Sequence, residues 1–178
     1  MKVSIVSIVK DYQIIVSVLM IFAAWRWGDW RNWKSYYPTM LFFALGDFVY
    51  GILTYNHPLW EFESPILKTT LSDLLICLVF FPATVLVYVP NYPTVLKKQI
   101  LYVLLWIIIY TVTKKVSHDL GFFSYHNGWN IWWSILFNFI MFPTLILHHK
   151  KPLWALLISA IVGTAVLVYF KVPFSSMK

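Results

Sequence analysis

Residues 69–89 read TTLSDLLICLVFFPATVLVYV, and this stretch decides the class of fold. A helix of about 20 largely apolar residues crosses a hydrocarbon core of about 30 Å. Asp73 is the only charged residue in the stretch. Because unpaired backbone groups are too costly in lipid, and the stretch lacks the alternating pattern of a barrel strand, we predict a membrane-spanning helix.

Five further stretches of similar character occupy most of the remaining chain, at residues 13–27, 37–55, 99–113, 129–147 and 153–170. Tryptophan and tyrosine favour the headgroup level of a bilayer, and they cluster at several ends of these stretches. Hydrophobic residues make up 60% of the chain and charged residues 12%, which is unlike a water-soluble domain. We therefore predict one all-α domain over residues 1–178, an integral membrane bundle of six transmembrane helices in the cell membrane.

An even number of spans places both chain ends on one side and divides the loops between two faces. We call the side of residues 28–36, 90–98 and 148–152 face A, and the side of residues 56–68 and 114–128 face B. With the terminal tails included, the two faces carry equal numbers of basic residues. Around the loops alone there are seven at face A (Arg26, Arg31, Lys34, Lys97, Lys98, Lys150 and Lys151) and three at face B (Lys68, Lys114 and Lys115). Because cytoplasmic loops are enriched in basic residues, we predict that face A is cytoplasmic.

Charge and motifs narrow the range of partners and reactions. The net charge of +7 fits contact with anionic lipid headgroups of the bilayer, and no basic run is dense enough for nucleic acid. The lone Cys77 makes no intrachain disulfide and no cysteine-based metal site, so we predict a small packing residue. The chain has no phosphate-binding glycine loop, Gly-x-Ser-x-Gly elbow or His-Glu-x-x-His helix, and no cofactor is indicated.

Three polar side chains inside the predicted spans are candidates for ligand binding. Asp47 and Asn138 lie about ten and nine residues from one end of their spans, hence about 14 to 15 Å deep. A carboxylate facing lipid at that depth costs about 3 kcal/mol or more, so Asp47 should face the interior. It would bind a ligand or proton with Asn138 as a hydrogen-bond partner, or else pack as a neutral acid. Asp73 lies nearer its span end, where reaching the headgroups is the simpler interpretation.

Two further patterns concern the shape of the helices. Pro82 and Pro143 each follow aromatic or methionine residues and precede a threonine. They predict kinks at matching depth, which either open a vestibule or only adjust packing. In the last span Ala155, Ser159 and Gly163 recur at intervals of four. This row predicts close packing of a neighbouring helix, with a homodimer seam as the alternative.

The loops of face B gather side chains that can ligate a metal or act as acid and base. One loop carries His57, Glu61 and Glu63, and the other carries His118, Asp119 and His126. Their spacing matches no established metal motif, so solvated loop residues are the simpler interpretation. If these loops do form a metal site, the expected ligands are His57, Glu61, His118 and His126. On face A, residues 148–152 (HHKKP) are interpreted as a basic turn.

Several segments resemble an uncharacterised family of small multi-spanning membrane proteins from Gram-positive spore-forming bacteria. The segments are YYPTMLFFA at residues 36–44, Asp47, HNGWN at residues 126–130, and MFPTLILHHKKPL at residues 141–153. The resemblance implies a compact helical bundle and assigns no activity. In size and span number the chain also resembles the substrate-binding membrane subunits of vitamin uptake transporters. That likeness is one of architecture and does not carry function.

Three hypotheses about function follow from these observations. The first is a protein that binds, and in one version transports, a small solute or lipid within the bundle at Asp47 and Asn138. The second is an intramembrane enzyme, metal-dependent or acid/base, that uses the histidines and carboxylates of face B. The third is a non-catalytic interaction or sensor subunit that uses the small-residue row. A polar cavity shared by Asp47 and Asn138 would favour the first.

Cysteine accessibility mapping in a background lacking Cys77 tests the predicted topology. Single cysteines placed beside Lys34, Lys97 and Lys150 should react with an impermeant reagent from one side of the membrane. Cysteines at Ser64 and Ser117 should react from the opposite side, because an odd number of spans separates the two groups. A split within either group would contradict six spans.

Overall fold

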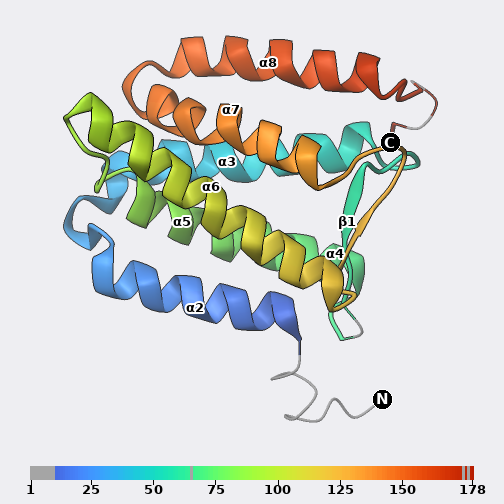
Figure 1. The fold of residues 1–178 in the computed structure, drawn as a ribbon, viewed down its shortest axis with the longest axis horizontal. Helices are drawn as coiled ribbons and strands as arrows, with labels where there is room; N and C mark the ends of the chain where they lie inside the picture. The colour runs from blue at the N-terminus through green and yellow to red at the C-terminus, as the bar shows by residue number, and fades with distance from the viewer. Residues whose placement is uncertain (1–10, 65, 174, 176) are drawn as a thin grey trace.

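The computed structural model describes residues 11–64, 66–173, 175 and 177–178. It is an all-α bundle with a small two-stranded sheet at one end (Figure 1). In chain order the elements are α2 (Tyr12–Trp27), η1 (Trp30–Asn32), α3 (Trp33–Leu53), β1 (Trp60–Phe62), α4 (Lys68–Leu75), η2 (Ile76–Phe80), α5 (Phe81–Tyr88), α6 (Leu96–Asp119), β2 (Phe123–Tyr125), α7 (Ile131–Lys150) and α8 (Pro152–Tyr169). The predicted all-α membrane bundle is confirmed.

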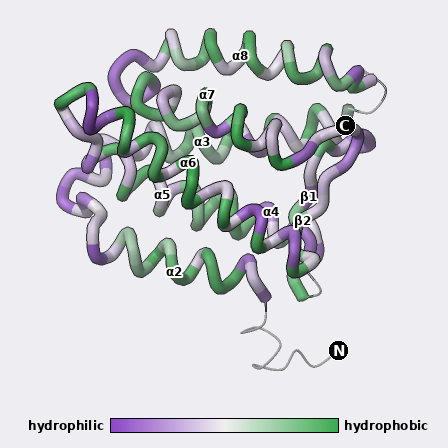
Figure 2. Tube along the Cα trace, viewed as in Figure 1, coloured by the Kyte–Doolittle hydropathy of each residue, from purple (hydrophilic) through white to green (hydrophobic). Residues whose placement is uncertain are grey.

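The helices are long, apolar and exposed in the way that a bilayer requires. Five helical runs within the described chain are long and apolar enough to cross a membrane, and α2 is a shorter apolar helix. Figure 2 shows hydrophobic residues along the helices and hydrophilic residues mainly near their ends. Leu19, Leu101 and Leu157 remain at least half exposed on the outside of the bundle. Such apolar surface is stable against lipid, so the chain is a membrane protein in contact with the bilayer.

The helices lie side by side, with α8 at one edge beyond α7 and α2 at the opposite edge (Figure 1). α7 packs against α3, α6 and α8, and α5 packs against α2 and α3. The strands β1 and β2 lie at face B. The backbone N–H of Lys178 donates to the carbonyl of Ile52 at 3.1 Å, which places this end of the chain at face B as well.

Two helices extend further than the sequence predicts. α6 ends at Asp119 rather than at residue 113, and α7 ends at Lys150 rather than at residue 147. The prediction stopped where charged residues begin, but a helix can continue through them where the side chains turn toward partners. His148 corrects the predicted basic turn: it is only 8% exposed, contacts the hydroxyl of Thr39 at 3.0 Å and stacks on Phe42 at 4.1 Å.

The third span is one helical run that changes pitch in the middle. α4 passes into the π-helical segment η2, which leads into α5 with Pro82 in its first turn. A π segment widens the helix locally. It lies directly before the turn that contains Pro82, where the proline has no N–H to donate to the preceding turn. The threonine after each predicted kink donates to the carbonyl four residues earlier, Thr84 to Phe80 and Thr144 to Ile140.

Aromatic rings fill the half of the bundle nearer face A. Tyr88 is fully buried, and its ring centroid lies 5.4 Å from Tyr102, 5.5 Å from Trp106 and 5.1 Å from Phe142. Its hydroxyl donates to the carbonyl of Phe142 at 3.2 Å. Edge-to-face and offset rings at these distances pack well, so this half is closely packed.

A short sheet joins the two loops of face B, which the sequence did not predict. β1 pairs antiparallel with β2, with Trp60 opposite Tyr125 and Phe62 opposite Phe123. The Tyr50 hydroxyl, on α3, donates to the carbonyl of Trp60 at 2.8 Å. It accepts from the N–H groups of Leu59 and Trp60 at 2.9 and 2.8 Å. One tyrosine therefore attaches β1 to the bundle.

Replacing this tyrosine by phenylalanine tests its role. Tyr50→Phe keeps the ring that stacks on Trp60 but leaves two N–H groups and a carbonyl without their partner. Each unsatisfied buried group costs about 1 to 3 kcal/mol, so the thermal unfolding midpoint in mild detergent should fall clearly. Tyr37→Phe, at a more exposed tyrosine of the same helix, should leave the midpoint unchanged. Equal midpoints for both variants would contradict the role of Tyr50.

Candidate functional site

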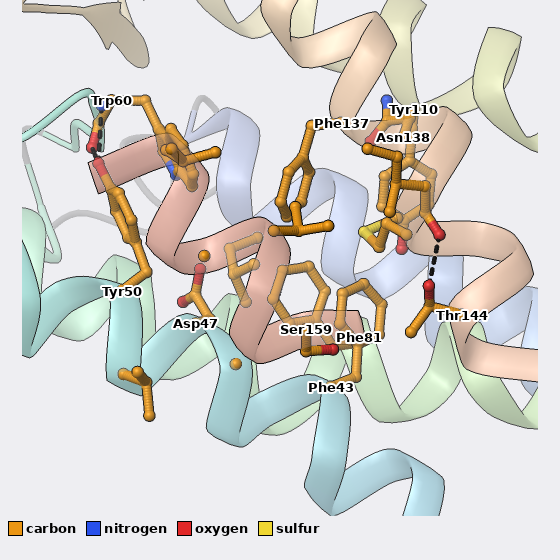
Figure 3. Close-up of a pocket in the computed structure, with 18 of the residues that line it drawn as sticks. Phe43, Asp47, Tyr50, Trp60, Phe81, Tyr110, Phe137, Asn138, Thr144 and Ser159 are labelled. Atoms are coloured by element: carbon orange, nitrogen blue, oxygen red, sulfur yellow. Dashed lines mark hydrogen bonds between the residues drawn. The ribbon is translucent and has the colours of Figure 1, made fainter. Parts of the chain in front are cut away.

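A partly open cavity of about 450 Å³ lies in the bundle, and its lining extends from Trp60 and Trp129 at face B to Thr144 and Leu156 nearer face A. Its walls come from α3, α7 and α8, with contributions from α2, α6, β1 and the π segment. Figure 3 shows a selection of the lining side chains. Sites for small molecules enclose about 300 to 1,000 Å³ and are mostly apolar with a few polar groups, so this cavity has the size of a ligand site.

Aromatic side chains form the ends of the cavity. Phe43 and Phe81 stack at a centroid distance of 4.0 Å, on the side toward the packed aromatic half. At the face B end, Trp60 stacks on Tyr50 at 3.8 Å and contacts Trp129 at 4.8 Å. The ring of Phe137 also lies against Trp60, at 6.1 Å. These rings form two aromatic parts of the wall of a cavity that is partly open.

Asp47 lines the cavity, as the sequence predicted for an inward-facing carboxylate. Its Oδ2 accepts from the Cys77 thiol at 3.4 Å, and the same thiol lies 3.2 Å from the carbonyl of Ala44. Cys77 is fully buried, so it packs as predicted and also contacts this carboxylate. Because α3 begins earlier and ends earlier than predicted, Asp47 lies only about 9 Å from its face B end.

Asn138 also lines the cavity and is 2% exposed. Its Nδ2 has no hydrogen-bond partner in the described structure. Counting from Ile131, it lies about 10 Å from the face B end of α7, and Figure 3 shows it farther from Trp60 than Asp47 is. The two side chains share the cavity, but Figure 3 shows them at separate places in it. The hydrogen bond expected between them is not formed among the described residues.

Lys114 is a third polar group in the cavity, and the sequence interpretation missed it. Its Nζ donates to the hydroxyl of Ser134 at 3.4 Å and lies 5.4 Å from the ring centroid of Trp60 and 5.0 Å from that of Phe123. The sequence predicts a span that ends at residue 113, which places this lysine in a loop of face B. The continuous helix α6 instead turns Lys114 inward and Lys115 outward, where it pairs with Asp119 at 2.9 Å.

Two of the three small residues of α8 border open space and do not pack closely against a neighbouring helix. Ala155 is fully buried, as predicted for close helix packing. Ser159 and Gly163 are exposed and line the cavity. A Cβ atom built on Gly163, or on Gly46 across the cavity in α3, would meet no atom within 4 Å. The row therefore supports packing at one end of α8 and forms a wall of the cavity further along.

Asp73 lies outside this cavity. It is half-buried on α4, and its carboxylate faces repulsion from the charges of Asp47 and Glu61. It is not among the residues that line the cavity. The structure therefore brings Asp47 and Asn138 together, adds Lys114, and leaves Asp73 apart.

The histidines and carboxylates of face B have separate partners. Glu61 and His126 form an ion pair at 3.2 Å across the sheet, and His118 Nδ1 lies 2.9 Å from the carbonyl of Phe123. His57 lies in the turn after α3, where its N–H donates to the carbonyl of Thr54. In the part of the chain that is described, no three His, Cys, Asp or Glu side chains come close enough to hold a metal ion. These residues hold the loops together and give no support to a metal-dependent enzyme.

Comparison of the chain with protein-family models, with curated proteins and with solved structures finds no match. The function must therefore be argued from the cavity itself.

The unpartnered amide of Asn138 gives a test of whether the cavity is a site or a packing defect. Asn138→Leu keeps the approximate shape and removes an unsatisfied buried polar group, so the empty protein should be as stable or more stable. Ser134→Ala, one helical turn away, removes the acceptor of Trp129 Nε1 (2.9 Å) and should cost about 1 to 3 kcal/mol. Thermal unfolding of both variants measures this contrast. A large loss of stability in Asn138→Leu would make the amide a structural group.

Proposed function

We propose that this protein is a binding protein of the cell membrane that holds a small amphipathic molecule in the cavity of its helix bundle. The buried Asn138 amide, without a partner inside a largely apolar cavity, is the observation that carries the proposal. Buried polar groups in folded proteins are almost always hydrogen-bonded, so an exception needs an explanation. A ligand that accepts a hydrogen bond from Nδ2 supplies one.

The distribution of polar and apolar groups supports an amphipathic ligand. Asp47 and Lys114 form a polar layer near the face B ends of α3 and α6, and Asn138 lies farther from Trp60 along the cavity (Figure 3). Beyond this polar layer the lining is formed by aromatic and aliphatic side chains such as Phe43, Leu145 and Val162. A molecule with one polar end and one apolar end would match both regions.

The proposal is for binding, because the cavity ends at closely packed aromatic rings. The stacked pair Phe43 and Phe81 forms part of its wall, and the buried rings around Tyr88 fill the interior of the face A half beside it. Transport across the membrane would require this packed half to open. The small-residue row lines the cavity, so it favours binding within the bundle over the interaction-subunit hypothesis.

Cavity-filling variants test the proposal directly. Gly46→Leu and Gly163→Leu place an apolar side chain in open space within the cavity, so they should fold and exclude the ligand. Gly51→Leu is the matched control, because its Cβ also meets nothing within 4 Å but the residue does not line the cavity. The readout is the small molecule that remains with protein purified in mild detergent, identified by native mass spectrometry.

We expect a bound molecule with the unsubstituted protein and with Gly51→Leu, and its loss with Gly46→Leu and Gly163→Leu at unchanged unfolding temperature. Retention of the same molecule by both cavity variants would refute the site. The unsubstituted protein carrying no molecule at all, even after incubation with extracted membrane lipids, would refute the function.

A further inference from the structure

The cavity opens sideways, between α3 and α8. Three of its lining residues are also exposed: Leu45 (56%) and Val49 (42%) on α3, and Ala160 on α8. We call this opening, together with Gly163, the portal. α3 and α8 each pack against α7, which forms the back wall. Because the portal residues are apolar and belong to membrane-spanning helices, the portal faces the hydrocarbon of the bilayer.

The portal has room for an extended chain. Gly46 on α3 and Gly163 on α8 carry no side chain, and a Cβ atom at either would meet nothing within 4 Å. Ala160, on α8, is a third small residue in the lining of the cavity. A continuous apolar slot thus leads from the lipid phase to the polar layer.

Two opposite charges face the interior of the cavity without forming an ion pair. Asp47 and Lys114 both line it and attract each other. Within the described residues, neither has an ion-pair partner within 4 Å. They lie about 9 and 7 Å from the face B ends of α3 and α6, which is close to the headgroup side of the hydrocarbon core. Two separate charges of opposite sign are complementary to a ligand headgroup that carries one positive and one negative charge.

From this placement we propose that the ligand is a membrane lipid with a zwitterionic head, which enters from the face B leaflet through the portal. The ammonium of the head lies at the Asp47 carboxylate, and its phosphate lies at the Lys114 ammonium. An ester carbonyl accepts from Asn138 Nδ2, and an acyl chain leaves the cavity between α3 and α8. This inference rests on the proposed function and specifies the ligand of the same cavity.

The chemistry of each contact agrees with the surroundings. Lys114 has one weak hydrogen bond, to Ser134 at 3.4 Å, so N–H groups remain for a phosphate. Oδ2 of Asp47 accepts from the Cys77 thiol, a weak donor, and leaves acceptor capacity for an ammonium. A volume of about 450 Å³ holds a head and part of one chain, which is why the chain must continue through the portal.

Lipid competition followed by native mass spectrometry tests the head. The full-length protein is equilibrated in mixed micelles with equal amounts of phosphatidylethanolamine, phosphatidylglycerol and diacylglycerol of the same acyl chains. The unsubstituted protein should retain phosphatidylethanolamine over the other two by about tenfold or more, because losing one hydrogen bond to a charged group weakens binding by about that factor. Asp47→Asn should shift the preference toward phosphatidylglycerol, since Lys114 then lacks a compensating charge.

Lys114→Met should lower both phospholipids relative to diacylglycerol by about tenfold. Lys115→Met is the matched control, because Lys115 is exposed and paired with Asp119 outside the cavity. It should leave the preference unchanged. Soluble phosphoethanolamine, which has the head but no chain, should not displace the lipid.

The outcomes separate this inference from the proposed function. Equal retention of the three lipids, or equal effects of Lys114→Met and Lys115→Met, would overturn the zwitterionic head. Displacement by phosphoethanolamine would make the ligand a soluble solute and overturn entry from the bilayer. In each case, loss of the ligand in Gly163→Leu would still support the proposed function. If Gly163→Leu also retained its ligand, the proposed function would fall with it.

Discussion

A polar group within hydrocarbon must find a partner, and most of this structure follows from that constraint. Tyr50 satisfies three backbone groups at the start of β1 with a single hydroxyl. Thr84 and Thr144 donate back to carbonyls beside the two prolines. Five buried side-chain atoms of the described residues lack a partner, and among them only the amide nitrogen of Asn138 belongs to a residue that lines the cavity. The Asn138 side chain lines the cavity of about 450 Å³, which is why we regard the unpartnered amide and the cavity as one feature.

The bundle is built asymmetrically, and the asymmetry follows from side-chain size. Toward face A, large rings from α5, α6 and α7 meet around Tyr88 and leave little free volume. Around the middle of α8, Ser159, Ala160 and Gly163 line the cavity, and their small side chains leave space on the side toward α3. Membrane helices gain no hydrophobic driving force from mutual contact, so poor packing here is offset only by lipid or ligand. If the proposed function is correct, an occupied cavity is the stable state of this part of the protein.

The sequence was sufficient for the class of fold and for part of the site. Runs of apolar residues predicted every membrane helix, because length and composition alone decide whether a helix can span the bilayer. The cost of burying a carboxylate in lipid correctly placed Asp47 inside. The sequence did not reveal Lys114 as a cavity residue, because a charged residue was taken to mark the end of the helix. In the structure the helix continues, and the Lys114 ammonium lies against the rings of Trp60 and Phe123. The pairing of β1 with β2 joins residues more than 60 positions apart. Strands of three residues are too short to show a sequence pattern from which this pairing could be predicted.

The central claim is that Asn138 and its neighbours bind the polar end of a molecule inside the bundle. An experimentally determined structure of the protein in a lipid bilayer tests this most directly. The account predicts density for a non-protein molecule in the cavity, with an acceptor atom within about 3 Å of Asn138 Nδ2 and an apolar part extending between α3 and α8. A cavity closed by inward movement of α8, with the Asn138 amide bonded to the protein itself, would contradict it.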